Sequence, residues 1–434
     1  MPLELIDTPA RSIAVIGGGI SGMAAAYLMS QRHRVTLFES EPRLGGHART
    51  VMAGKRGDQP VDTGFIVFNY ANYPHLTALF DKLDVPVCKS NMSFGASFGG
   101  GAFEYSLSGF DEIFATRTNL ANPRYWAMIR DILRFNKRGL AIAQADPSLS
   151  IGGLLERLGT GDWFRERYLL PFSGAIWSTP TQKILDFPAT AMMEFFRNHA
   201  LLGYEGQHQW YTVKGGSIEY VTRLTAYLER AGVGLRAGTP VQSVRRAPMD
   251  VFVKTHGAEE ERFDEVIFAT HSDVTLRLLA DPSAAEAKAL DAVKYQRNDA
   301  VLHCDTAFMP KRRKCWSSWV YTERGPEDRE RISLSYWMNS LQPVIAQDDP
   351  MFVTLNANHP VREDCIYDSY SFDHPVYDTA ALAAQSAVRD FNGTNRTWFC
   401  GAWMRNGFHE DGFASAVDVA RAMDARARKL ASVA

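Results

Sequence analysis

Residues 12–22 read Ser-Ile-Ala-Val-Ile-Gly-Gly-Gly-Ile-Ser-Gly. The first five form a short apolar run that is typical of a buried parallel strand. Gly17, Gly19 and Gly22 follow in the spacing Gly-x-Gly-x-x-Gly, and residues 21–31 are compatible with a helix. In such a unit the first glycine makes a tight turn, the second admits a pyrophosphate close to the backbone, and the third lets the helix lie on the strand. The stretch therefore predicts a strand, a turn and a helix that bind a dinucleotide.

The next predicted strand, residues 34–39, ends in an acid. Glu39 lies 20 residues after Gly19, where a carboxylate can accept hydrogen bonds from both hydroxyls of a ribose. The free N–H groups at the start of the predicted helix favour phosphate groups. The cofactor-binding residues predicted here, beside the glycines, are Ile20, Ser21, Glu39 and Ser40.

Two segments after Glu39 indicate FAD rather than NAD. Residues 43–50 read Arg-Leu-Gly-Gly-His-Ala-Arg-Thr, and residues 61–65 read Val-Asp-Thr-Gly-Phe. They resemble the flavin-containing amine oxidase superfamily, which includes monoamine and polyamine oxidases, protoporphyrinogen oxidase and phytoene-type desaturases. The resemblance implies an FAD whose pyrophosphate is wrapped by Arg43, Gly45 and Gly46 and whose flavin is approached by Asp62, Thr63, Gly64 and Phe65. His47 stands where many members carry arginine, and it either covers a phosphate or caps the loop.

The resemblance recurs along the rest of the chain. Residues 211–217 are similar to the family's segment before a helix, and residues 238–244 to the strand that pairs with adenine, at Val241 here. Residues 263–270 resemble the strand that returns to the nucleotide domain and ends at Thr270. Residues 398–403 and 409–415 resemble the C-terminal flavin motif, which implies flavin contacts by Gly401, Glu410, Asp411, Gly412 and Ala414.

The last motif has a physical logic of its own. A helix that starts at Asp411 and Gly412 would point its N-terminus at the flavin edge that gains negative charge on reduction. The Asp411 side chain is equally well explained as a plain N-cap. Cys400 reads as a buried strand residue, and no cysteine has a covalent-flavin arrangement, so we expect noncovalent FAD.

The fold class that follows is α/β, with a Rossmann-like FAD-binding domain of parallel strands and helices and a discontinuous α+β substrate domain with an antiparallel sheet. The predicted FAD-binding domain comprises residues 1–75, 205–285 and 390–434. The predicted substrate domain comprises residues 76–204, mostly helical, and 286–389. Its sheet, the floor of a substrate cavity, is predicted from residues 299–308, 315–321, 331–338 and 351–356.

Composition excludes several classes of protein. The net charge of −2 gives no electrostatic reason to expect nucleic acid. The five cysteines are scattered and form no Cys-x-x-Cys pair, so neither a metal site nor a disulfide framework is predicted. We expect a cytoplasmic protein, because no uncharged stretch reaches the roughly 20 residues of a spanning helix.

Two basic segments are compatible with peripheral contact between the protein and the inner face of the membrane. Residues 122–140 form a basic amphipathic pattern, read either as a core helix with a solvated face or as a helix on acidic lipid. Residues 311–314 read Lys-Arg-Arg-Lys and are either a solvated turn or a contact with lipid headgroups.

The combination Gly-Ala-Trp…Gly-Phe-His-Glu-Asp-Gly near the C-terminus resembles a bacterial subgroup that includes the desaturase of methylated and furan fatty acid synthesis. This implies dehydrogenation of an acyl chain of a membrane phospholipid, with oxygen or a redox partner as electron acceptor. Two alternatives stay open, namely an oxidase of a soluble amine and a flavin-binding module without turnover. The candidate apolar lining of the cavity is Phe195, Phe196, Leu201, Leu202, Tyr204, Trp210, Tyr336, Trp337 and Met338.

Three residues are predicted to act at the flavin face. Phe408 matches one of the two aromatic walls of amine oxidases, and Trp403 is the candidate for the other. His409 is the candidate proton acceptor, since imidazole titrates near neutrality, with Glu410 orienting it; the alternative is that it only packs on the flavin. For the lysine of amine oxidases only Lys214 and Lys294 are available by order.

Overall fold

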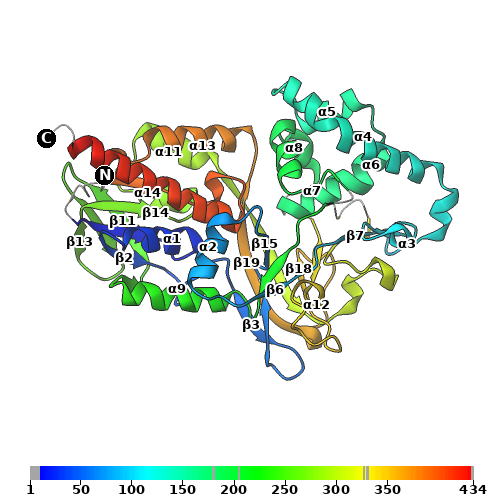
Figure 1. Cartoon of the computed structure of the whole chain (residues 1–434), viewed down its shortest axis with the longest axis horizontal. Coiled ribbons are helices and arrows are strands. Elements are labelled where there is room, and N and C mark those ends of the chain that lie inside the picture. The colour runs from blue at the N-terminus through cyan, green and yellow to red at the C-terminus, as the bar shows by residue number, and fades with distance from the viewer. Residues whose placement is uncertain (1–9, 178–180, 204–205, 326–327, 329–331, 432–434) are drawn as a thin grey trace, which may run out of the picture.

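The computed structural model describes residues 10–177, 181–203, 206–325, 328 and 332–431. Figure 1 shows a parallel sheet with its helices at one end of the molecule and a second sheet under a layer of helices at the other. Long segments of the chain cross between the two ends, so both are built from distant parts of the sequence.

The parallel sheet has the strand order β10-β2-β1-β14-β20. Its strands are β1 Ser12–Ile16, β2 Arg34–Phe38, β10 Gly234–Arg236, β14 Glu265–Phe268 and β20 Thr397–Phe399. Every neighbouring pair is parallel, which confirms the predicted Rossmann-like fold class.

Both faces of this sheet are covered because both faces of its strands are apolar. Ile13 and Val15 point into one core cluster, while Ala14 and Ile16 point into another. The helices in the first cluster are α1 Ile20–Met29, α2 Pro74–Lys82, α9 Ile218–Arg230 and α14 His409–Ala431. The second cluster holds α11 Ala284–Ala292, α13 Thr379–Phe391 and the antiparallel strands β11 Val241–Arg246, β12 Val251–Thr255 and β13 Glu260–Phe263.

Three predicted domain boundaries fall inside helices. The boundary after residue 75 lies in α2, the one after 285 in α11, and the one after 389 in α13. Helix α2 packs against α14, and α11 and α13 share a core cluster with the parallel sheet. This packing requires long-range contacts that an amphipathic pattern does not specify. The predicted boundary between residues 204 and 205 lies outside the described residues.

The second sheet has seven strands in the order β19-β15-β18-β17-β16-β7-β8. Its strands are β7 Phe94–Phe98, β8 Phe103–Ser106, β15 Lys294–His303, β16 Trp319–Glu323, β17 Leu334–Trp337, β18 Phe352–Leu355 and β19 Ile366–Val376. It is antiparallel apart from the parallel pair β16–β7, so the predicted antiparallel sheet is in fact mixed. The prediction missed β7 and β8, which precede the helical part of residues 76–204, and β19, whose polar residues leave no clear apolar alternation.

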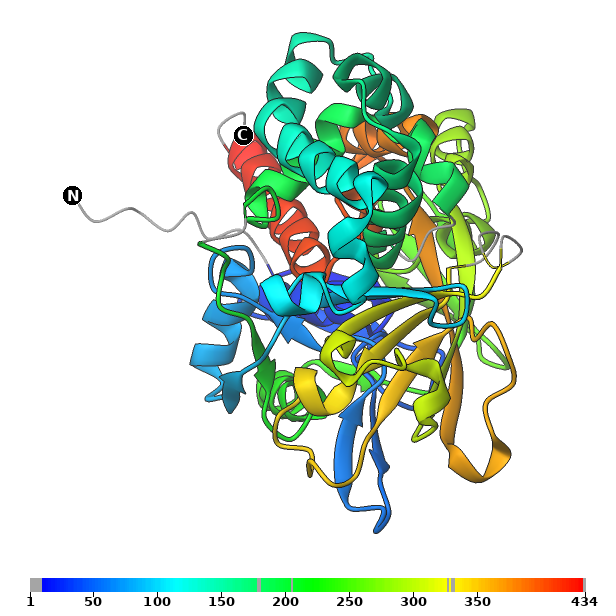
Figure 2. The same ribbon diagram turned by 90° about the vertical axis from the view of Figure 1, so that its right-hand side faces the viewer.

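Helices cover this second sheet, as Figure 2 shows. They are α3 Phe110–Ile113, α4 Pro123–Ala145, α5 Ile151–Leu158, α6 Asp162–Phe164, α7 Leu170–Trp177 and α8 Ala189–Asn198, and they share one core cluster. The Asn122 side chain caps α4 by accepting from the Arg124 amide, and Pro123 fills the first helical position. The helix predicted over residues 122–140 therefore exists and runs five residues further.

The remaining strands and α-helices are short. They are β3 Thr50–Ala53, β4 Gln59–Asp62, β5 Val67–Phe68, β6 Val87–Lys89, β9 Tyr211–Val213, α10 Ser272–Leu278 and α12 Met338–Leu341. Within the described part of the chain, no helix combines the length and the apolar character needed to cross a membrane.

Candidate active site

One cavity of about 1230 Å³ runs from the turn between β1 and α1 to the helices α4, α7 and α8. Single-ligand pockets are usually about 300–1,000 Å³, so this cavity has room for a nucleotide cofactor and a second molecule. We call the part near β1 and α1 the nucleotide end and the part among the helices the far end.

The glycine fingerprint shapes the nucleotide end. Gly17 has φ of +106°, and a Cβ on it would lie 2.8 Å from the Ala269 carbonyl oxygen. A Cβ on Gly22 would lie 1.7 Å from the Gly17 carbonyl oxygen, so α1 can approach β1 only with glycine there. Gly19, with Ile20 and Ser21 at the start of α1, lines the cavity, and their backbone lies where a pyrophosphate would bind.

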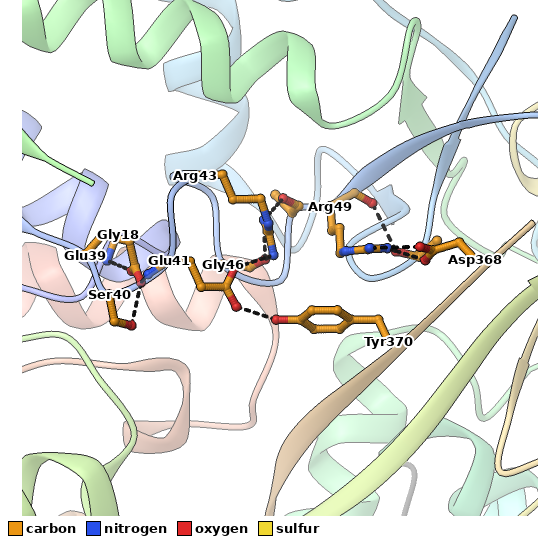
Figure 3. Close-up of polar contacts among 11 residues, drawn as sticks. Gly18, Glu39, Ser40, Glu41, Arg43, Gly46, Arg49, Asp368 and Tyr370 are labelled. Atoms are coloured by element: carbon orange, nitrogen blue, oxygen red, sulfur yellow. Dashed lines mark hydrogen bonds and ion pairs between the residues drawn. The ribbon is translucent and has the colours of Figure 1, made fainter. Parts of the chain in front are cut away.

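Glu39 lies at the end of β2 and also lines the cavity. One carboxylate oxygen accepts from the Gly18 amide at 2.6 Å, and the other accepts from the Glu41 amide at 2.8 Å and the Ser40 hydroxyl at 3.0 Å (Figure 3). These bonds hold the carboxylate beside the glycine turn. A carboxylate has about four acceptor positions and three are used here, so one remains for a ribose hydroxyl.

The loop after β2 meets the glycine turn backbone to backbone. Gly45 donates its amide to the Gly18 carbonyl at 2.8 Å, and a Cβ on Gly46 would lie 3.0 Å from the Gly19 Cα atom. Gly46 lines the cavity and Gly45 does not. The paired glycines therefore form a narrow cradle that a side chain would fill.

Arg43 does not have the predicted role of wrapping the pyrophosphate. Its guanidinium donates to the Gly46 carbonyl at 3.0 Å and pairs with Glu41 at 3.1 Å, and it does not line the cavity. These groups of its own loop occupy the guanidinium, so Arg43 braces the loop (Figure 3).

The same loop is tied to β19 of the second sheet. Arg49 forms a two-point ion pair with Asp368 at 2.6 and 3.1 Å, and the Tyr370 hydroxyl donates to Glu41 (Figure 3). Bidentate pairs of this kind are strongly directional. They fix the nucleotide end relative to the second sheet.

His47 lines the cavity. Its ring centroid lies 4.9 Å from Phe372, 5.6 Å from His374 and 6.2 Å from His271. Burial lowers the pKa of His47 well below its ordinary value, so the ring is neutral at physiological pH. It can donate or accept a hydrogen bond at the cavity wall, but it does not supply the positive charge of an arginine.

The segment 62–65 divides between two roles. Thr63, Gly64 and Phe65 line the cavity, as predicted for residues near a flavin. The Asp62 carboxylate points into the protein, where it accepts from the Ser217 amide and hydroxyl and the Gln342 amide group. Burial raises the pKa of Asp62 to about 6. Asp62 therefore joins segment 62–65 to residues 211–217 instead of contacting a cofactor.

The residues predicted from the C-terminal flavin motif also fall into two groups, those that line the cavity and those that do not. Gly401, Trp403, Phe408 and His409 line the cavity, together with Thr270, whose carbonyl accepts from the Trp403 indole at 3.1 Å. The other four predicted flavin contacts, Glu410, Asp411, Gly412 and Ala414, do not line it. The helix α14 begins at His409, two residues before the predicted start. That shift turns the later residues away from the cavity.

Three of those residues hold helix ends together. The Glu410 carboxylate accepts from the His75 and Leu76 amides at 2.9 Å each, which caps α2 instead of orienting His409. Asp411 accepts from the Phe408 amide at 2.9 Å, so it bonds the N-cap amide from the third position of α14 and is not itself the N-cap that the sequence suggested. A Cβ on Gly412 would lie 2.8 Å from the Ser21 hydroxyl, so Gly412 lets α14 lie against α1.

Tyr220 orients His409. The Tyr220 hydroxyl lies 2.6 Å from Nε2 of His409, and the His409 ring stacks on Phe65 with centroids 3.9 Å apart. Burial lowers the pKa of His409 to about 3. The predicted titration of His409 near neutrality is therefore not found, and its Nε2 atom is already hydrogen-bonded to Tyr220. Its neutral ring supports a cavity wall, because desolvation disfavours the charged form.

Phe408 forms a wall with α8. Its ring stacks on Phe195 at 5.2 Å, and His199 lies 5.8 Å away. Phe195 in α8 and His199, which directly follows α8, both line the cavity. Sequence reasoning named Phe195 but missed His199 and Tyr220, since a single histidine or tyrosine on an amphipathic helix carries no motif.

The far end is lined by apolar side chains of α4, α7 and α8. Of the candidate lining residues, Phe195, Leu201, Trp210 and Tyr336 line the cavity, whereas Phe196, Leu202, Trp337 and Met338 do not, and Tyr204 lies outside the described residues. The far-end residues contributed by α4 and α7 are Tyr125, Met128, Ile129, Ile132, Leu133, Asn136, Phe172, Ile176 and Trp177, of which Asn136 is polar.

Charge is scarce in the cavity. Among the described residues that line it there is no lysine or arginine, and the carboxylates are Glu39 and Asp373. Lys294 is exposed and pairs with Asp291, and Lys214 lies in a separate shallow pocket. Val241 starts β11 and is also outside the cavity lining. Nor does any cluster of three metal-binding side chains occur in the described ranges.

The nucleotide end fits FAD. A close glycine cradle, the start of α1 and an acid at the end of β2 are placed for the pyrophosphate and ribose. Gly401, Thr63 and Phe65 surround the space that follows, where a planar ring system would lie. The cavity then continues into the far end, so a substrate can reach that ring.

Comparisons with known proteins agree with this geometry. The model of the family described as flavin containing amine oxidoreductase matches residues 20–347. Carotenoid phi-ring synthase from Streptomyces griseus is 28% identical over 299 residues, which are 63% of this chain and 54% of that protein. Protoporphyrinogen oxidase from Homo sapiens is 24% identical over 316 residues, 65% of this chain and 64% of that protein. The chain thus spans about half of the first relative and less than two thirds of the second.

Solved structures share the fold across nearly the whole chain. A fatty acid isomerase from P. acnes that produces CLA has a TM-score of 0.66 at 15% identity, over 94% of this chain and 97% of that one. Putrescine oxidase bound to putrescine has a TM-score of 0.66 at 14% identity, over 96% and 99%. With the family match over most of the sequence and a nucleotide end that fits FAD, the chain belongs to the flavin-containing amine oxidoreductase family.

Proposed function

We propose that this protein is an FAD-dependent oxidoreductase that dehydrogenates a long apolar chain, and that the chain is a methylated fatty acyl group of a membrane phospholipid. The observation that carries the proposal is the far end of the cavity, which is long, largely apolar and without lysine or arginine among its described lining residues. Burying an acyl chain there is favourable by about 0.8 kcal/mol for each CH₂ group.

The fold alone does not choose this substrate. The same fold serves a fatty acid isomerase and putrescine oxidase, so the choice rests on the cavity lining. A carboxylate that would bind an amine cation is absent from the lining of the far end on α4, α7 and α8, as far as the structure describes it. The amine alternative also lacks its lysine, because neither Lys214 nor Lys294 reaches the cavity.

The reaction removes two hydrogens from neighbouring carbons. An allylic carbon gives up a hydride, the next carbon gives up a proton, and a C=C bond forms. Bound FAD supplies the two-electron acceptor for the hydride, and oxygen or a redox partner finally takes the electrons. The protein's own tasks are to hold the chain between its aromatic walls, exclude water and accept the proton.

His199 is placed to accept that proton. Its Nδ1 atom lies 3.0 Å from the Phe195 carbonyl oxygen. A carbonyl can only accept, so Nδ1 carries the hydrogen and the lone pair of Nε2 is free for a proton. Burial lowers the pKa of His199, which keeps the ring neutral and able to accept. Its position beside Phe408 puts it in the wall where the chain would pass.

Noncovalent attachment of FAD is part of the proposal. None of the five cysteines lines the cavity. Burial raises the pKa of Cys400 to about 12, which leaves its thiol protonated and unreactive. We expect denaturation alone, without protease, to release the flavin from the chain.

The test measures the absorbance of the enzyme-bound flavin while candidate substrates reduce it under anaerobic conditions. Detergent-dispersed phospholipids with unsaturated, methyl-branched chains should bleach the flavin and yield a product two hydrogens lighter. Fully saturated phospholipid with the same headgroup is the control and should not. Bleaching by a panel of primary amines, with none by lipid, would establish the amine oxidase instead.

A further inference from the structure

We infer that the outer face of α3, the turn after it and α4 docks on an anionic phospholipid bilayer, and that the acyl chain enters the cavity there. The term docking face denotes the exposed residues Leu107, Phe110, Leu120, Trp126 and Leu133. The inference deepens the proposed function, and its claim about chain entry rests on it.

Exposed apolar side chains gather in this part of the molecule. Eleven large apolar residues are exposed among those described, and five of them lie between residues 107 and 133. Phe110 is 69% exposed and Trp126 is 46% exposed. Large apolar groups gathered on a surface mark a site of protein or membrane contact.

Contacts make the docking face continuous. The Phe114 ring lies 4.8 Å from Phe110 and 5.1 Å from Trp126. The Trp126 indole donates to the Leu120 carbonyl at 2.9 Å. Both helices lie at the end of the molecule remote from the parallel sheet (Figure 1), on the side turned to the viewer in Figure 2.

Helix α4 alternates apolar and basic residues along its outer side. Trp126, Arg130, Leu133 and Lys137 follow at spacings of four, three and four, which places them in one row on the helix surface. The helix carries five basic residues and one acid, Asp131, which is buried. The whole chain has a net charge of −2, so this positive charge is local.

The basic segment 311–314 borders the same face. Lys314 and Arg117 both pair with Asp111 on α3. Segment 311–314 and Arg117 supply five basic residues against the three acids Glu104, Asp111 and Glu112, so positive charge is in excess there. The Arg313 guanidinium lies 3.6 Å from the centre of the Trp316 ring. Apolar groups ringed by basic ones suit the boundary between acyl chains and anionic headgroups.

The cavity reaches the surface within this face. Leu107 and Leu133 are exposed and also line the cavity, with Ile129 and Ile132 behind them. An acyl chain entering between the two leucines would pass from the bilayer to the far end without crossing water, which avoids the cost of hydrating it.

The positive charge of the docking face also favours a bilayer over a second copy of this chain. Two copies of this face would bring like charges together, which opposes self-association. A bilayer with anionic headgroups offers both the opposite charge and an apolar interior, so we commit to the bilayer.

The experiment measures sedimentation of the full-length holoenzyme with vesicles of fully saturated phosphatidylcholine, with and without phosphatidylglycerol. Saturated chains keep binding separate from turnover. Binding should require phosphatidylglycerol and fall as salt is raised. The double variant Arg124→Glu with Lys137→Glu should bind at least about 30-fold more weakly, since each basic residue near the surface contributes about 1 kcal/mol. Its control, Lys254→Glu with Lys288→Glu, makes the same charge change on exposed residues of the other end and should bind normally.

A second pair tests the apolar half. Phe110→Ser should weaken binding, whereas Met249→Ser, at a residue 68% exposed, should not. Retained flavin absorbance and an unchanged melting temperature show that each variant is folded. Equal binding to both vesicle types, no binding by the wild type, equal losses in the controls, or a dimer that Phe110→Ser dissociates would overturn the inference. Failure to bind while dispersed lipid still bleaches the flavin refutes docking alone, and binding without bleaching refutes the proposed function alone.

Discussion

The chemistry of each histidine in the cavity depends on its surroundings. His409 is buried between Phe65 and Tyr220, and this burial lowers its pKa to about 3. Since an unfolded histidine has a pKa near about 6.5, folding must release a proton between these two values. The residue therefore contributes stability above pH ~6.5 that is lost as the pH falls towards about 3.

This linkage predicts a pH-dependent difference between the wild type and His409→Gln. Between pH 7 and 5 the stability of the wild type relative to the variant should fall by about 2 kcal/mol, because only the wild type protonates there on unfolding. Urea unfolding at both pH values measures it. Other buried histidines are present in both proteins and cancel. A difference that does not change with pH would show that His409 titrates normally in the folded state.

His199 should behave as the proton acceptor. His199→Asn keeps a polar side chain but lacks the basic Nε2, so substrate-driven flavin reduction should slow by about 100-fold or more. The acidic limb of the pH profile of kcat/KM should disappear, which a merely structural role would not cause. His208→Asn, at a nearby histidine outside the cavity lining, is the control. Near-normal reduction by His199→Asn would remove the residue from the mechanism.

At the scale of elements, β1 and α1 form the most constrained unit of the fold. A Cβ on Gly22 would meet the Gly17 carbonyl oxygen at 1.7 Å, far inside van der Waals contact. We expect Gly22→Ala to displace α1, abolish flavin retention and destabilise the protein by several kcal/mol. Gly152→Ala on α5 is the contrast, since its Cβ would have an ordinary contact of 3.4 Å. It should be neutral or stabilising by up to ~1 kcal/mol. Copurified flavin and melting temperature check both.

Regular elements with strong apolar patterns were predictable from sequence, and irregular ones were not. β1, β2 and α4 have continuous or periodic apolar residues, and each lies within a few residues of its expected place. β19 was missed because its side chains are largely polar, and its eleven residues are held by pairing with β15. Tertiary pairing of this kind overrides weak strand propensity.

At the scale of the whole molecule, the far end of the cavity exists because α4 packs across from α7 and α8. Its length should set the length of the substrate. Ile129→Trp would fill the space, so activity on long acyl chains should fall at least about tenfold while short chains and flavin content are unaffected. Leu140→Trp, on the same helix outside the cavity lining, controls for overpacking, which costs about 1–3 kcal/mol. Equal losses for all chain lengths would place the substrate elsewhere.

The sequence by itself determined the nucleotide-binding unit, its acid at Glu39 and the α/β fold class. Each of these depends on residues close together in the chain, where backbone sterics and helix geometry leave few alternatives. Only the tertiary structure decided which side chains face the cavity. Arg43, Asp62 and Glu410 turn away because groups from their own loop or from distant segments satisfy them first.

The roles of His199 and Tyr220 also depend on distant partners. His199 follows the amphipathic helix α8 and lines the cavity beside Phe408, whereas Tyr220 lies in the amphipathic helix α9 and bonds to His409; these partners are about 190–210 residues away in sequence. Local patterns specify elements, but the partners of a buried polar group are chosen by packing between elements, because burial without a partner is costly.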